Sequence, residues 1–160
     1  MSASLDKSKG PGIYIPPPLF YVLTFIIALQ IQKKVPISDM LFHTTIMKLL
    51  GVIFILGSLF FLIRSLRQFF ITKNTVVLIK PASSLQTTGV YAITRNPMYL
   101  GLGILYVGIT GLIGNWWNLI LFPFLMLIIQ EYIIKREERY LEAAFGQEYI
   151  QYKSKTRRWL

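Results

Sequence analysis

The chain has no cysteine, a single histidine and only seven acidic residues among its 160. Without cysteine it can form neither a disulfide framework nor a thiolate metal site, and it has no thiol nucleophile. With His43 as the only histidine, neither a histidine-based metal centre nor a serine–histidine–aspartate triad is available. Metal-dependent and triad-type hydrolytic chemistry are therefore not expected, and no metal site is predicted.

Charge is also missing from three long stretches, residues 13–31, 49–63 and 96–130, and the mean hydropathy of the chain is +0.53. A helix needs about 20 mostly apolar residues to cross the hydrocarbon core of a bilayer. The third stretch is too long for one crossing, and Gly114-Asn115 divides it. Four transmembrane helices are thus predicted. They cover about residues 13–32, 46–64, 98–113 and 116–134.

The distribution of the basic residues predicts how these four spans are oriented in the membrane. Four spans place both termini and the loop between the second and third spans on one side, which then holds 14 of the 17 Lys and Arg. Such an excess marks the cytoplasmic side, so both termini are expected there. The net charge of +10 is then explained by membrane topology, and no nucleic-acid partner is predicted. In a three-span alternative the first apolar segment lies in the membrane interface, because Pro16 to Pro18 interrupt regular helix.

We expect an all-α, multi-pass membrane protein with one membrane-embedded domain over residues 13–160. A polar, flexible tail precedes it over residues 1–12. The third and fourth spans form a helical hairpin, with Trp116 and Trp117 at a membrane interface. Cytoplasmic helices follow over residues 135–155, and Gly146 divides them.

Arg95, Asn96 and Pro97 stand where the third span begins. Pro97 suits the first turn of a helix, and Asn96 suits the cap before it. The free N–H groups and the positive dipole end of that helix attract anionic groups. Arg95 adds a planar, two-pronged donor for a carboxylate or phosphate. The simpler interpretation is a helix cap with an arginine that anchors the membrane edge.

Five of the seven acids follow or end the fourth span: Glu131, Glu137, Glu138, Glu142 and Glu148. Residues 131, 135, 138 and 142 fall on one helical face. Lys135 is the ordinary i+4 partner of Glu131, whereas Glu138 and Glu142 repel each other unless a cation such as Arg95 or a ligand ammonium lies between them. For Glu142 and Glu148 the simpler interpretation is a solvated face.

Glycines crowd the third span. Gly108, Gly111 and Gly114 recur at every third position, and small residues let neighbouring helices approach closely. Gly101 lies one turn from Arg95 and is a candidate ligand contact.

Two motifs together resemble a known family. T-T-G-V-Y-A-I-T-R-N-P-M-Y-L-G, residues 87–101, is similar to the G-x-Y…R-H-P-x-Y-x-G signature of the integral-membrane isoprenylcysteine carboxyl methyltransferases and their phospholipid methyltransferase relatives. K-R-E-E-R-Y-L-E-A-A-F-G-Q-E-Y-I-Q-Y-K…R-R-W-L, residues 135–160, resembles that family's E-E-x-x-L…F-G-x-x-Y-x-x-Y ending. The resemblance covers about half the chain.

The resemblance implies a methyltransferase that uses S-adenosylmethionine and releases S-adenosylhomocysteine. Its cofactor would lie in a helical, membrane-embedded pocket between the arginine-proline loop and the double-glutamate helix. By position, the cofactor contacts would be Gly89, Tyr91, Arg95, Asn96, Pro97, Tyr99, Gly101, Glu137 and Glu138. The residues expected to carry catalysis are Arg95, Tyr99 and Glu138.

Within that implied site, Glu138 is expected to pair with the cofactor's ammonium, and the start of the third span to receive its carboxylate. An aromatic ring, of Tyr99 or Tyr106, would face the sulfonium. Asn96 stands where the family has histidine, and an amide cannot take a proton. A positional role is therefore expected of Asn96, not the role of a base.

The expected acceptor is lipophilic and enters from the bilayer, with its reactive end near the cytoplasmic interface. A prenylcysteine-like carboxylate, a phospholipid amine and a small thiol all remain open. A carboxylate needs no base, whereas an amine or thiol would need Glu137, Glu138 or a tyrosine. Two other functions remain alternatives: an NADPH-dependent membrane reductase related to sterol reductases, and a non-catalytic membrane scaffold.

Overall fold

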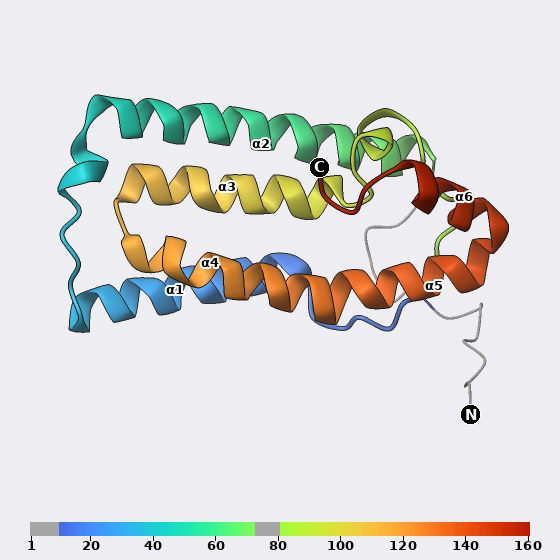
Figure 1. Ribbon diagram of the computed structural model, residues 1–160, viewed down its shortest axis with the longest axis horizontal. Coiled ribbons are helices and arrows are strands. Elements are labelled where there is room, and N and C mark those ends of the chain that lie inside the picture. Colours follow the sequence, from blue (N-terminus) through green and yellow to red (C-terminus); the bar gives the residue numbers. More distant parts are fainter. Residues whose placement is uncertain (1–9, 73–80) are drawn as a thin grey trace.

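The computed structural model describes residues 10–72 and 81–160, and within these ranges all regular structure is helical, as predicted. Four long helices run side by side along the long axis of the molecule, in alternating directions (Figure 1). They are α1 (Pro17–Lys34), α2 (Thr45–Ile71), α3 (Pro97–Ile113) and α4 (Trp116–Ile128). The short 3-10 turns η1 (Met40–His43) and η2 (Gly89–Ala92) precede α2 and α3.

The fourth helix continues beyond α4 without a break. A π-helical segment, η3 (Ile129–Ile134), joins α4 to α5 (Lys135–Phe145). Gly146, with φ 55°, then separates α5 from α6 (Gln147–Lys155), as expected from its sequence. The start of α1, the end of α2, the start of α3 and both C-terminal helices therefore lie at one end of the bundle (Figure 1).

Two helices of the described chain are long and apolar enough to cross a membrane, Thr45–Ile71 and the continuous helix Trp116–Phe145. Helix α3 is apolar and has 17 residues. The crossing of the membrane by α1 and α3 stays a prediction.

Helices α2 and α3 pack closely through glycine. A Cβ on Gly108 would lie 2.9 Å from the carbonyl oxygen of Gly51, and a Cβ on Gly51 would lie 3.0 Å from that of Gly108. A Cβ on Gly111 would lie 3.4 Å from the Cα of Gly51, so the predicted packing role of these glycines is confirmed. Gly101 also lies at this contact between α2 and α3, called here the α2–α3 seam, since a Cβ there would lie 3.0 Å from the side chain of Leu62.

The predicted hairpin between α3 and α4 is present. Gly114 ends α3 with φ 76°, a left-handed conformation that suits glycine. Asn115 caps α4, because its Oδ1 accepts a hydrogen bond from the N–H of Trp117 at 2.9 Å. The indole N–H groups of Trp116 and Trp117 both donate to carbonyls of the segment that joins α1 to η1, at 3.0 and 2.8 Å.

The first helix begins at Pro17, four residues after the predicted start of the first span. Pro17 and Pro18 occupy its first turn, where a missing N–H costs no hydrogen bond, and the helix is regular from there. Ile13 lies in the extended segment before it and is 3% exposed. The second helix also extends seven residues past its predicted end, to Ile71. Residues 1–9 of the predicted tail lie outside the described residues.

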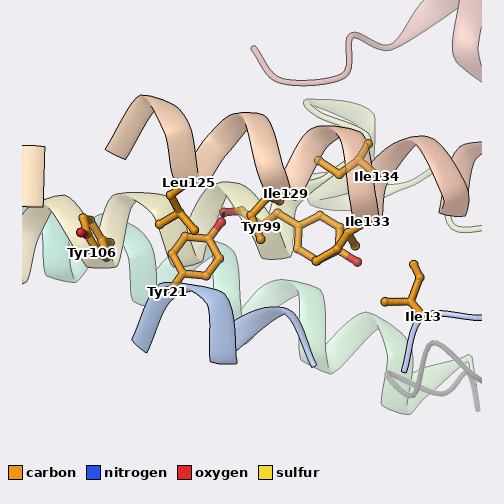
Figure 2. Packing of buried hydrophobic residues seen from close by; sticks show 8 residues of the cluster. All are labelled: Ile13, Tyr21, Tyr99, Tyr106, Leu125, Ile129, Ile133 and Ile134. Carbon is orange, nitrogen blue, oxygen red and sulfur yellow. Dashed lines mark hydrogen bonds between the residues drawn. The ribbon is translucent and has the colours of Figure 1, made fainter. Parts of the chain in front are cut away.

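Ile13 belongs to a buried cluster that joins α1, α3 and the α4–η3 helix (Figure 2). Its members are Ile13, Tyr21, Tyr99, Tyr106, Leu125, Ile129, Ile133 and Ile134. The hydroxyl of Tyr21 donates to the carbonyl oxygen of Tyr99 at 3.0 Å. This core therefore fixes the first turn of α3, where the predicted site lies.

Candidate functional site

A cavity of about 480 Å³ lies at the end of the bundle where the loop before α3 meets the C-terminal helices. Its size is within the usual range for small-molecule sites, about 300–1,000 Å³. Residues 11–18, the end of α2, the loop, the start of α3, α5 and α6 all contribute to its walls. Seven of the nine predicted contacts line it: Tyr91, Arg95, Asn96, Pro97, Tyr99, Glu137 and Glu138.

Gly89 and Gly101, the other two predicted contacts, are not among the lining residues. Gly89 has φ 63° and begins the turn η2, whereas Gly101 faces α2. Tyr106, suggested as a partner of the sulfonium, is also absent from the lining. Its hydroxyl donates to Oδ1 of Asn118 at 3.1 Å, deeper in the bundle.

Helix α3 begins at Pro97, as predicted, and Asn96 occupies the cap position. The side chain of Asn96 makes no capping hydrogen bond, so that part of the prediction was wrong. Its Nδ2 donates instead to the carbonyl oxygen of Arg158 at 2.9 Å. Asn96 thus joins the start of α3 to the C-terminal segment.

Arg95, Glu138 and Arg158 form a partly buried ion cluster. Nη2 of Arg95 donates to Oε1 of Glu138 at 2.8 Å. Arg158 approaches the same carboxylate with two donors, Nε to Oε1 at 3.0 Å and Nη2 to Oε2 at 2.7 Å. Burial acts to raise the pKa of Glu138, but the hydrogen bonds from the two arginines outweigh it and the pKa is lowered. The same hydrogen bonds raise the pKa of Arg158.

The guanidinium of Arg95 is fixed from a second side. Nη1 donates to the carbonyl oxygens of Thr156 at 2.8 Å and of Lys153 at 3.1 Å. Nε is buried and has no hydrogen-bond partner within the described ranges. Arg95 is nevertheless among the residues that line the cavity, so its guanidinium places a positive charge beside it.

Glu137 lines the cavity in a different environment. Its Oε2 accepts a hydrogen bond from the Tyr99 hydroxyl at 2.7 Å, and no Lys or Arg of the described chain forms an ion pair with it. Burial raises the pKa of Glu137, and the charge of Glu138 adds to this, while the hydrogen bond from Tyr99 opposes it. Of these two neighbouring acids, Glu138 therefore belongs to an ion cluster, whereas Glu137 has no cationic partner in the described chain.

The remaining acids lie where the sequence indicated. Glu131 pairs with Lys135 at 2.7 Å, and both are exposed. Glu142 pairs with Lys153 at 3.1 Å, again at the surface. Residues 131, 135, 138 and 142 line one shallow hollow on the outer side of the helix, so the predicted shared face is confirmed. The repulsion expected between Glu138 and Glu142 is relieved by cations, Arg95 among them.

The C-terminal segment is the part of the site that the sequence analysis missed. The Thr94 hydroxyl donates to the carbonyl oxygen of Arg158 at 3.0 Å, and the N–H of Arg95 donates to that of Arg157 at 3.0 Å. Trp159 Nε1 donates to Oε1 of Gln130 at 3.2 Å. The available signal was R-R-W-L, residues 157–160, at the end of the second motif. Its contacts could not be inferred, because some are to backbone carbonyls and the others join side chains 20 to 29 residues apart.

The chain belongs to the phospholipid methyltransferase family, whose model matches residues 45–148. It is 38% identical over 72 residues to a protein-S-isoprenylcysteine O-methyltransferase of Schizosaccharomyces pombe, and 39% identical over 69 residues to that of Saccharomyces cerevisiae. These matches cover 45% and 43% of this chain, but only 30% and 29% of the two yeast enzymes.

An uncharacterized protein of Haemophilus influenzae is 46% identical over 66 residues, which are 39% of this chain and all of that protein. No solved structure matches the chain significantly. The family and its apolar helices identify a membrane protein of the methyltransferase class, and the expectation drawn from the two motifs is confirmed at that level.

Proposed function

We propose that the protein is an S-adenosylmethionine-dependent methyltransferase that modifies a lipophilic acceptor. The observation that carries this proposal is the pair of oppositely charged groups in one cavity wall, the guanidinium of Arg95 and the carboxylate of Glu137, which has no cationic partner in the described chain. A carboxylate and an ammonium on the same ligand would complement both. The amino-acid end of S-adenosylmethionine carries these two groups.

The residues fit such a ligand in a specific way. Arg95 and the free N–H groups in the first turn of α3 would hold the carboxylate. Glu137 would bind the ammonium, in place of Glu138, because both oxygens of Glu138 already accept hydrogen bonds from arginines. The Tyr99 hydroxyl orients Glu137, and its ring lies in the cavity wall.

When bound, the cofactor supplies an electrophilic methyl group on a sulfonium. The protein has to align the acceptor with that group and keep water out. Leu66, Phe69 and Leu102 provide apolar wall for this purpose. A carboxylate acceptor would need no base. An amine or a thiol would have to lose a proton to a base, for which the cavity wall offers its tyrosines or Glu137, whose pKa is raised by burial, when Glu137 is not paired with the ammonium.

We propose further that one membrane-embedded domain, residues 13–160, crosses the bilayer four times with both termini in the cytoplasm. Large apolar side chains are exposed along α2 in support of lipid contact, among them Leu49, Ile53, Leu56, Phe60 and Ile63. Soluble proteins rarely expose a continuous apolar surface of this extent. The acceptor would reach the cavity from the surrounding membrane lipids.

The proposal is tested by titrating S-adenosylhomocysteine into the detergent-solubilised protein in a calorimeter. We expect binding, and weakening by about tenfold or more in Glu137→Gln, because a charged hydrogen bond contributes roughly 1.5–3 kcal/mol. The exposed Glu148 provides the matched control Glu148→Gln, which should bind as the unmodified protein does.

NADPH binding in place of S-adenosylhomocysteine would support the reductase alternative, which the methyltransferase relatives do not favour. Binding of neither ligand, with activity in cells unaffected by Arg95→Ala, would support the scaffold. Transfer of a labelled methyl group to a whole-membrane extract would then identify the acceptor. A base-labile product indicates a carboxyl ester, and a stable one indicates an amine or thioether.

A further inference from the structure

Arg158 is bound to the site but does not line the cavity. It lies beyond the segment that the family model matches, residues 45–148. Its side chain is 30% exposed and reaches Glu138 from the outer side, whereas Arg95 is 9% exposed and reaches the same carboxylate from the cavity side. Glu138 therefore stands between a cavity arginine and an outer arginine.

The cluster has a simple charge balance, because two guanidinium groups share one carboxylate and the net charge is +1. Without Arg158, Glu138 would neutralise Arg95 alone. The cluster would then have no net charge to offer an anion in the cavity. Coulombic attraction is strong at such short range in a partly buried site, so this difference should be large.

The backbone of the same segment sets the direction of Arg95. The carbonyl oxygens of Lys153 and Thr156 accept from Nη1, and that of Arg157 accepts from the Arg95 N–H. Both hydrogens of Nη1 and one of Nη2 have acceptors within the described ranges, so the guanidinium is held in a fixed plane and keeps one further hydrogen on Nη2. The C-terminal segment thus orients the guanidinium of Arg95 through backbone carbonyls, and through Arg158 it provides a second positive charge to Glu138.

We propose that Arg158 is a positioning residue: by sharing Glu138 it leaves Arg95 with the charge and orientation needed to bind the carboxylate of the ligand. This inference rests on the proposed cofactor site, but it concerns a residue that would not touch the cofactor. It predicts that Arg158 matters for ligands that carry a carboxylate and not for ligands of the same shape without one.

The test compares two ligands in the detergent-solubilised full chain. S-adenosylhomocysteine carries the carboxylate, and 5′-methylthioadenosine has the same nucleoside without the amino-acid end. In Arg158→Gln we expect the Kd of S-adenosylhomocysteine to rise by about tenfold to 100-fold, as for loss of a charged hydrogen bond. The Kd of 5′-methylthioadenosine should change by less than about twofold.

Two further variants isolate the charge balance. The double variant Glu138→Gln/Arg158→Gln removes both partners, returns the net charge to +1, and should recover most of the affinity for S-adenosylhomocysteine. Arg158→Lys keeps the charge and should remain within about threefold of the unmodified protein. The control is Arg157→Gln, which removes the same charge from the exposed neighbouring side chain and should bind both ligands normally.

Equal weakening of both ligands in Arg158→Gln, or no recovery in the double variant, would show that Arg158 only supports the fold and would overturn the inference. If Arg158→Gln does not fold, Arg158→Lys still decides the question, because a loss of tenfold or more for S-adenosylhomocysteine alone contradicts the charge argument. Failure of the unmodified protein to bind either ligand would instead refute the proposed function, and this inference with it.

Discussion

The seam between α2 and α3 allows a quantitative prediction that is independent of function. In Gly108→Ala the new Cβ would lie 2.9 Å from the Gly51 carbonyl oxygen, 2.9 Å from Cγ1 of Ile55 and 3.0 Å from the Ile55 N. Two of these three atoms belong to the backbone, which cannot turn aside as a side chain can. The helices therefore have to separate by a few tenths of an ångström along the seam.

Overpacking of this kind costs about 1–3 kcal/mol. For a chain of this size each kcal/mol lowers the Tm by about 2–4 °C, so the expected loss is roughly 2–12 °C. The measurement is thermal unfolding in detergent, followed by intrinsic tryptophan fluorescence at fixed protein and detergent concentration.

Gly57→Ala provides the matched control. It makes the same substitution in α2, at an exposed position where a new Cβ has no neighbour within 4 Å. Alanine is the better helix former by about 0.5–1 kcal/mol, so this variant should be as stable as the unmodified protein or more stable. Equal Tm values for Gly108→Ala and Gly57→Ala would show that α2 and α3 do not pack through glycine as described.

Tyr99→Phe keeps the ring but removes the hydrogen bond to Glu137, so S-adenosylhomocysteine should bind about tenfold more weakly in calorimetry while 5′-methylthioadenosine binds unchanged. The pKa of Glu137 is raised by burial, so its charged form is lost as the pH falls through that pKa. Affinity for S-adenosylhomocysteine should therefore rise with pH and level off above the pKa, and a profile equally steep in Glu137→Gln would exclude Glu137 as its source. Because the chain has no cysteine, Ser38→Cys and Ser154→Cys each introduce a unique thiol at an exposed position. A membrane-impermeant maleimide added to intact cells should label Cys only in the first, and the reverse result would overturn the proposed orientation.

Local signals were sufficient for most of the helix boundaries. Pro97 begins α3, Gly114 ends it, and Gly146 separates α5 from α6, because each position depends on the backbone preference of one residue. The start predicted for the first span, residue 13, came instead from the first residue of the charge-free stretch, and the prolines favoured only the three-span alternative. Three successive prolines were interpreted as interrupting regular helix, although two of them occupy a first turn that needs no N–H.

The site was predicted as far as its two motifs extend. The spacing could not distinguish Glu137 from Glu138, since their difference comes from Arg158 and Tyr99, which meet them only in three dimensions. No sequence pattern predicts the hydrogen bond from Asn96 to a backbone carbonyl 62 residues away either. Contacts to main-chain atoms leave the identity of the partner residue open, so the C-terminal segment could not be assigned from composition or periodicity.

The π-helical segment η3 has a consequence for how the site tolerates changes in chain length. Successive residues of a helix point about 100° apart, so Glu137 lines the cavity alone, whereas Glu138 lines both the cavity and the outer hollow. A π-helical turn holds about one residue more than an α-helical turn, so deleting one residue from Ile129–Ile134 would restore α-helical geometry and leave the orientation of α5 nearly unchanged. The wide turn thus lets the helix that carries Glu137 and Glu138 absorb a one-residue change in length without turning these acids away from the cavity.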